Sequence, residues 1–118
     1  MILPFLTRAQ EIQSVDPKVA YYSRMYAVTQ VLQVPRRHPA ITDIVKVTLA
    51  QMEKDKSRLA LGQEDQAHCE SFALKVFANA DRVDRAGKAS IDTCKAFFAA
   101  AQFVEMLNQF APNDEDLL

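Results

Sequence analysis

Residues 16–27, DPKVAYYSRMYA, decide the fold of this 118-residue chain. Asp16 followed by Pro17 is typical of a helix start, because the carboxylate accepts free N–H groups and proline loses no hydrogen bond there. At about 100° per residue, the helix carries two apolar stripes. The first is Tyr21, Met25, Val28 and Leu32, and the second is Val19, Tyr22 and Tyr26. A helix with two apolar stripes packs between two neighbours, so we predict the middle helix of a bundle.

The composition is that of an ordinary soluble globular protein, with 49% apolar and 25% charged residues. A net charge of −1 gives no field that favours nucleic acid. Two glycines argue against a β-rich fold and against a glycine-rich phosphate loop. The start MILPFL lacks a basic leader, and no apolar run reaches the ~18 residues of a membrane span. We therefore expect a cytoplasmic protein with no signal peptide and no direct membrane insertion.

Periodicity and breakers predict an all-α chain without strands. Pro35 and Pro112 each end a helix, and Gly62 and Gly87 are natural C-terminal stops. Short loops make neighbouring helices antiparallel. The expected helices span residues 4–15, 17–34, 39–61, 64–83 and 90–111. The first three form an up-down-up bundle, and the last two form a hairpin.

The helix expected at residues 90–111 is apolar over about half its circumference, more than one antiparallel neighbour can bury. Phe103, Leu107 and Phe110 are expected to be left open by the hairpin. The first bundle, a further helix or a second chain must cover this face. One prediction is therefore a homodimer through these three residues.

The residues that carry catalysis or metal binding do not cluster in this sequence. His38 and His68 are the only histidines, and no HExxH, CxxC, GxSxG or Walker pattern occurs. Cys69 and Cys94 fall on apolar helix faces and are expected to be buried free thiols. The charged group Asp81, Asp84 and Arg85 is interpreted as a solvated helix corner. We predict no enzyme activity, no cofactor and no metal.

Three segments together resemble a known family. The segments are DPKVAYYSRMYA at 16–27, HCESFALKVFANADRVDRAGKA at 68–89 and KAFFAAAQFVEMLNQF at 95–110. They are similar to the amino-terminal region of the Vta/LIP family, and their residues look closest to those of plant-like members. Members of that family are cofactors of the AAA ATPase that disassembles ESCRT-III polymers on endosomes. With the spacing between them, the matches cover nearly the whole chain.

The resemblance implies tandem MIT (microtubule-interacting and transport) modules, which are three-helix bundles that bind carboxy-terminal helices of ESCRT-III subunits. It places the first module at 1–62, a hairpin of a second module at 63–111 and an acidic tail at 112–118. The binding groove of such modules lies between the second and third helices. Carried onto this sequence, it gives Val45, Leu49 and Met52, with Lys56 able to meet acidic partner residues.

Helical wheels independently single out apolar residues that the fold does not need. They are Leu49 and Met52 at the edge of the third helix, Leu74 on the fourth and Phe98 on the fifth. Such side chains are typical of binding surfaces. The alternative for each is ordinary packing against a neighbour.

Two parts of the family pattern have no match in this chain. They are the carboxy-terminal domain that contacts the ATPase and the last helix of the second MIT module, so the chain resembles a fragment or a short form. We expect a non-catalytic adaptor in endosomal multivesicular-body sorting, recruited to endosomal membranes by ESCRT-III tails. Any ATPase contact would need the unmatched domain. The alternative is a helical oligomerisation or scaffold module.

Overall fold

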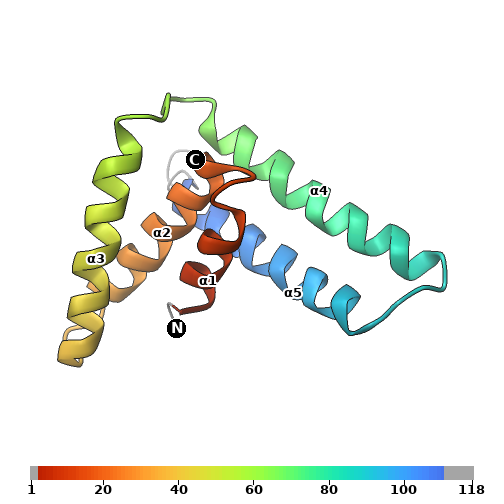
Figure 1. Ribbon diagram of the computed structural model, residues 1–118, viewed down its shortest axis with the longest axis horizontal. Coiled ribbons are helices and arrows are strands. Elements are labelled where there is room, and N and C mark those ends of the chain that lie inside the picture. The colour runs from red at the N-terminus through yellow and green to blue at the C-terminus, as the bar shows by residue number, and fades with distance from the viewer. Residues whose placement is uncertain (1–2, 111–118) are drawn as a thin grey trace, which may run out of the picture. The chain divides into compact units, whose positions relative to one another are not determined.

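The computed structural model describes residues 3–110, and every regular element in that range is a helix. The predicted all-α class is confirmed (Figure 1). The described residues divide between Asp65 and Gln66 into two compact units. The assignment of 1–62 and 63–111 as two MIT modules stays a prediction. The elements are α1 (Leu3–Ile12), α2 (Pro17–Leu32), α3 (Pro39–Lys56), α4 (Asp65–Arg85), α5 (Ile91–Met106) and the 3₁₀ helix η1 (Leu107–Phe110).

The first unit is a three-helix bundle in which α2 lies between α1 and α3 (Figure 1). The Asp16 carboxylate caps α2 by accepting the Val19 N–H at 3.1 Å, and Pro17 opens the helix. Both apolar stripes of α2 contribute to the core: Val28 from the first and Tyr26 from the second are buried. Tyr26 meets Phe5 of α1 edge to face at 4.9 Å between ring centroids. The predicted middle position of this helix is confirmed.

All three helices of the first unit are shorter than the sequence suggested, α2 by two residues. The helix α1 ends at Ile12, and α3 ends at Lys56 rather than at residue 61. Gly62 was expected to end α3, but the helix already ends at Lys56, and the φ of Gly62 is not positive. Its N–H instead binds the Asp65 side chain at 2.9 Å. The prediction for Gly62 was therefore wrong, because a contact three residues ahead fixes this turn.

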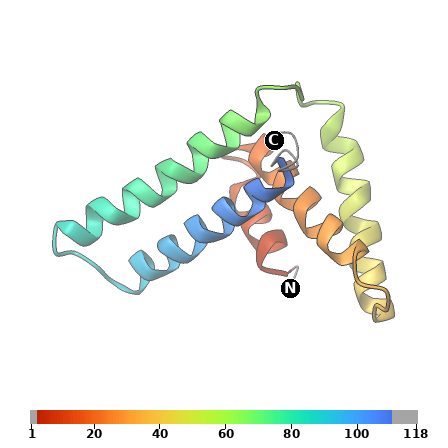
Figure 2. The same cartoon turned by 180° about the vertical axis from the view of Figure 1, so that it is seen from behind.

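In the second unit α4 and α5 run antiparallel (Figures 1 and 2). Two edge-to-face ring pairs join them, Phe72 with Phe103 at 5.1 Å and Phe77 with Phe97 at 5.6 Å. At the start of α5, the side chain of Ser90 and that of Thr93 form a capping box. This cap is local and satisfies N–H groups that the helix itself leaves free.

The apolar face of α5 is arranged differently from the expectation. Phe103 is only 3% exposed and meets Phe72 edge to face, and Leu107 and Phe110 are half-buried. These three residues therefore offer less open surface than expected, and the homodimer stays a prediction. Cys94 is also exposed, contrary to prediction, whereas Cys69 is buried.

The two glycines allow a matched test of backbone conformation. Gly87 has φ +75°, and Gly62 does not have a positive φ; an added Cβ would meet nothing within 4 Å at either position. Gly87→Ala should therefore lower the free energy of unfolding by about 1 kcal/mol, because a left-handed conformation strains any residue with a Cβ. Gly62→Ala should change it by less than about 0.5 kcal/mol. Urea denaturation followed by circular dichroism measures both, and equal effects would contradict the assignment.

Candidate partner-binding surface

The four α3 residues expected to bind a partner form one stripe at helical spacing. Val45 and Met52 are buried and contribute to the core of the first unit. Leu49 is 43% exposed and lies between them at the edge of the stripe, and Lys56 at the end of the helix is exposed. Only Leu49 and Lys56 therefore offer much side-chain surface, with Val45 and Met52 holding the stripe against α2.

The first turn of α3 is fixed by local hydrogen bonds that position this stripe. Pro39 opens the helix, as predicted, and the His38 Nδ1 accepts the Ala40 N–H at 3.0 Å. Arg37 donates to the Val34 carbonyl at 3.1 Å and to the Val31 carbonyl, in the last turn of α2, at 3.4 Å. Because the cap and the arginine both lie in one loop, the end of α2 and the start of α3 are tied together. The histidine cap has no standard sequence signature, and sequence reasoning missed it.

The opposite edge of α3 rests on a polar network that crosses α2. Arg24 of α2 donates to the Gln13 side chain at 2.5 Å and pairs with Asp55 of α3 at 3.6 Å. Gln51 also donates to Asp55, at 3.0 and 3.1 Å. Burial lowers the pKa of Arg24, and the charge of Asp55 raises it by less. The pKa of Arg24 therefore lies below its ordinary value. The network fixes the rotation of α3 about its axis and so determines which edge presents Leu49.

A cleft of about 400 Å³ lies above this network between α1 and α3, with Leu6 and Val47 in its walls. Val47 is 71% exposed and Leu49 is 43% exposed. These two residues point about 200° apart around α3. The α3 helix therefore has two exposed apolar edges, one beside α1 and one away from it, and the sequence singled out only the second.

The two candidates in the second unit do not share a site. Leu74 is 65% exposed and lies in a shallow groove of about 460 Å³ formed by residues of α4 alone, among them Ala67, Ser71 and Ala78. Phe98 is largely exposed on α5 and does not line that groove. The two side chains therefore lie on different helices and line no common groove. Phe77, which meets Phe97 edge to face, is also half-exposed.

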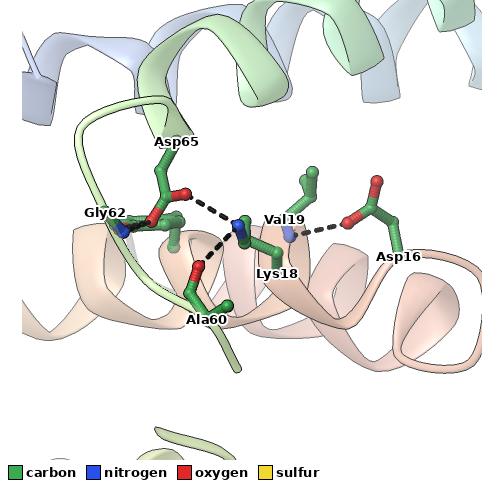
Figure 3. A network of polar contacts seen from close by, with 7 residues as sticks. Asp16, Lys18, Val19, Ala60, Gly62 and Asp65 are labelled. Carbon is green, nitrogen blue, oxygen red and sulfur yellow. Dashed lines mark hydrogen bonds and ion pairs between the residues drawn. The ribbon is translucent and has the colours of Figure 1, made fainter. Parts of the chain in front are cut away.

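The most strongly bonded carboxylate of the first unit is Asp65, which sequence reasoning missed. Its side chain is 2% exposed. It accepts the Lys18 ammonium at 2.8 Å and the Gly62 N–H at 2.9 Å (Figure 3). It also accepts the Tyr22 hydroxyl at 2.5 Å. Lys18 also donates to the Ala60 carbonyl at 2.9 Å (Figure 3). The network thus ties the segment that follows α3 to the first turns of α2. No local pattern marks this pairing, which joins residues more than forty positions apart.

The environment of Asp65 favours its charged form. Burial alone would raise the pKa of this carboxyl, but hydrogen bonds from Lys18, Tyr22 and Gly62, together with the Lys18 charge, lower it below its ordinary value. A carboxyl whose pKa is lower in the folded chain than in the unfolded chain stabilises the fold only while it is ionised. The network should therefore depend on pH.

We expect this contribution to be present in full above about pH 4, the ordinary range of an aspartate, and to be lost as the pH falls further. Asp65→Asn removes the titrating group. The difference in unfolding free energy between the wild type and Asp65→Asn should thus be large near about pH 6 and smaller near about pH 3. Urea denaturation at the two pH values measures it. A difference that does not shrink in acid would contradict the network.

Metal-ligating side chains do not gather in residues 3–110. No group of three or more His, Cys, Asp or Glu side chains within that range could hold a metal ion. The charged corner at the end of α4 is exposed, as expected, and consists of an ion pair between Arg85 and Asp81 at 2.8 Å. None of the helices described here is both long and apolar enough to cross a membrane.

A three-helix bundle followed by a helical hairpin, with apolar residues exposed along helix edges, is consistent with an MIT-type helical bundle. The family model described as "Vta1 like" matches residues 1–118, and the chain belongs to this family. The resemblance seen in the sequence is thereby confirmed.

Relatives of this chain include proteins named for vacuolar protein sorting. The Arabidopsis thaliana protein named homolog of mammalian LYST-interacting protein 5 is 46% identical over 118 residues, which is 98% of this chain and 28% of the relative. The Homo sapiens vacuolar protein sorting-associated protein VTA1 homolog is 34% identical over 111 residues, 89% of this chain and 36% of the relative. The Dictyostelium discoideum VTA1 homolog is 30% identical and is covered over 22% of its length. The chain therefore spans about a fifth to just over a third of the length of these relatives.

Proposed function

We propose that this chain is a non-catalytic adaptor of endosomal protein sorting that binds the carboxy-terminal helical tails of ESCRT-III subunits. Family membership over the whole chain is the observation that carries this proposal. The names of the relatives, which refer to vacuolar protein sorting, support it. In the full-length relatives this region would be the regulatory part of a cofactor of the ESCRT-III-disassembling AAA ATPase. Recruitment to endosomal membranes would follow from tail binding.

The proposed contact surface in the first unit is the α3 edge that carries Leu49. An amphipathic partner helix would lay its apolar face along this edge beside α2. Leu49 offers the exposed apolar contact, and Lys56, two turns further along, would meet an acidic residue of the partner. Buried Val45 and Met52 would hold this surface in place from below. Leu74 and Phe98 are proposed as separate contacts of the second unit.

Leu49→Asp should weaken the binding of an ESCRT-III tail peptide by about 10- to 100-fold, because it buries an unpaired charge against the partner helix. The measurement is fluorescence anisotropy with labelled tail peptides from several subunits. Since Leu49 is partly exposed, circular dichroism should show that the variant stays folded.

Val47→Asp is the matched control, since it puts the same charge on the same helix at a more exposed position on the other edge. It should leave the Kd within about twofold. If both variants weaken binding equally, or if Leu49→Asp binds every tail as the wild type does, the proposed surface is wrong.

Apolar exposure in the second unit favours one alternative, a helical oligomerisation module. Leu74, Phe77, Phe98 and Val104 are all exposed by about half or more. Light scattering over a concentration series tests this alternative. A stable oligomer that binds no tail peptide would favour it over the adaptor.

A further inference from the structure

A second cleft of about 400 Å³ lies at the loop end of the first unit, where α1 begins, α2 ends and α3 begins. Its walls carry branched apolar side chains. Leu3 of α1 is 51% exposed and Val34 after α2 is 48% exposed, while Val31 is buried beneath them. Ile41 of α3 is half-buried and also lines the cleft. A concave site with exposed branched side chains can take up one apolar side chain of a ligand.

The same cleft has a basic rim formed by consecutive loop residues, Arg36, Arg37 and His38. Arg37 is held in place by its bonds to the Val34 carbonyl at 3.1 Å and to the Val31 carbonyl at 3.4 Å. The His38 ring accepts the Ala40 N–H through Nδ1, which places the proton of the neutral ring on Nε2, as a donor. Both anchored residues therefore keep N–H groups available for an acceptor at the rim.

The positive charge of this rim is not compensated locally. The sequence contains no Asp or Glu from residue 17 to residue 42, although acidic residues outnumber basic ones in the chain as a whole. Among residues 3–110, no acidic side chain forms an ion pair with Arg36 or Arg37. Elsewhere along α3, acidic and basic residues alternate. The loop end is thus an apolar cleft with an unpaired cationic rim.

We propose that this cleft binds an acidic peptide segment that carries a branched apolar side chain. The apolar side chain enters between Leu3 and Val34, and flanking carboxylates meet Arg36 and Arg37, whose planar guanidinium groups suit carboxylates. The site lies apart from the Leu49 edge and does not depend on tail binding there. An anionic membrane is the less suitable occupant, because the apolar groups line a hollow and stable attachment to anionic lipid takes more basic residues than this rim holds.

The test uses the whole chain and two labelled synthetic peptides. One peptide has two leucines four residues apart with four flanking glutamates, and the other has glutamine at every glutamate position. The acidic peptide should bind at least about tenfold more tightly than the glutamine peptide, and this preference should weaken with added salt. Equal binding of the two peptides, or no binding of either, would overturn the proposal.

Variants locate the site. Arg36→Glu and Val34→Asp should each weaken binding of the acidic peptide at least about tenfold. Arg58→Glu makes the same change in net charge at an exposed position outside the cleft and should leave the Kd within about twofold. An equal loss with Arg58→Glu would overturn the site, as would vesicles of phosphatidylserine that bind the chain and displace the peptide. The Leu49→Asp variant should bind the acidic peptide as the wild type does. A wrong assignment of this cleft can therefore be distinguished from a wrong assignment of the Leu49 surface on α3.

Discussion

Asp65→Ala is expected to lower the free energy of unfolding by about 3 kcal/mol, because removing one member of a buried charged network leaves its partners unsatisfied. Three donors lose their acceptor: the Lys18 ammonium, the Tyr22 hydroxyl and the Gly62 N–H. Lys18 keeps its bond to the Ala60 carbonyl and can still reach water, so its share of the loss is smaller.

Asp81→Ala provides the matched control for this experiment. Asp81 forms an ion pair with Arg85 at 2.8 Å, the same distance as between Asp65 and Lys18. The Asp81 pair, however, lies on the surface and within one helix. Exposed pairs of this kind contribute little, so stability should change by less than about 0.5 kcal/mol. Urea denaturation at neutral pH compares the two variants. Equal stability losses would show that the Asp65 network is no stronger than a surface contact.

Phe5→Ala is expected to cost about 3 to 4 kcal/mol and to detach α1 from the first unit. The α1 helix has 10 residues, and its buried residues are Phe5 and Ala9. A helix of that length is not stable alone in water, so it depends on packing against α2. Truncation of Phe5 removes the ring pair with Tyr26 and leaves a cavity. Hydrogen exchange should therefore show strong loss of protection in α1.

Leu3→Ala tests whether that loss comes from burial rather than from any truncation in α1. Leu3 lies in the same helix but is half-exposed, so the change should cost less than about 1 kcal/mol. Protection in α2 and α3 should persist in both variants. If amides of α1 exchange at the wild-type rate in Phe5→Ala, the helix is held by something other than this ring.

The features that the sequence predicted are those that local chemistry settles. Asp16 and Pro17 start α2, and Gly87 follows the end of α4 with φ +75°. Each depends on hydrogen bonds or backbone sterics within a few residues, so a short stretch of sequence contains all that is needed. The two apolar stripes of α2 likewise required neighbours on both sides, whichever helices those turned out to be.

The candidate surface was predictable only in part. Helical spacing put Val45, Leu49 and Met52 on one stripe, but it could not tell which of them the core would take. Packing against α2 buries Val45 and Met52, and the network through Arg24 and Asp55 sets the rotation that leaves Leu49 open. Exposure at a helix edge depends on a rotation of a few tens of degrees, which the tertiary contacts fix.

Other features were decided by tertiary structure alone. The contacts of Asp65 with Lys18 and Tyr22 join residues more than forty positions apart and fix the turn at Gly62, where the sequence had indicated a helix stop. Phe103 is buried on Phe72 whereas Phe98 remains exposed, although both are phenylalanines of α5. Sequence alone thus determined where the main helices begin and which faces needed partners. Only the fold decided which partner each face received, because that depends on residues distant in the chain meeting in space.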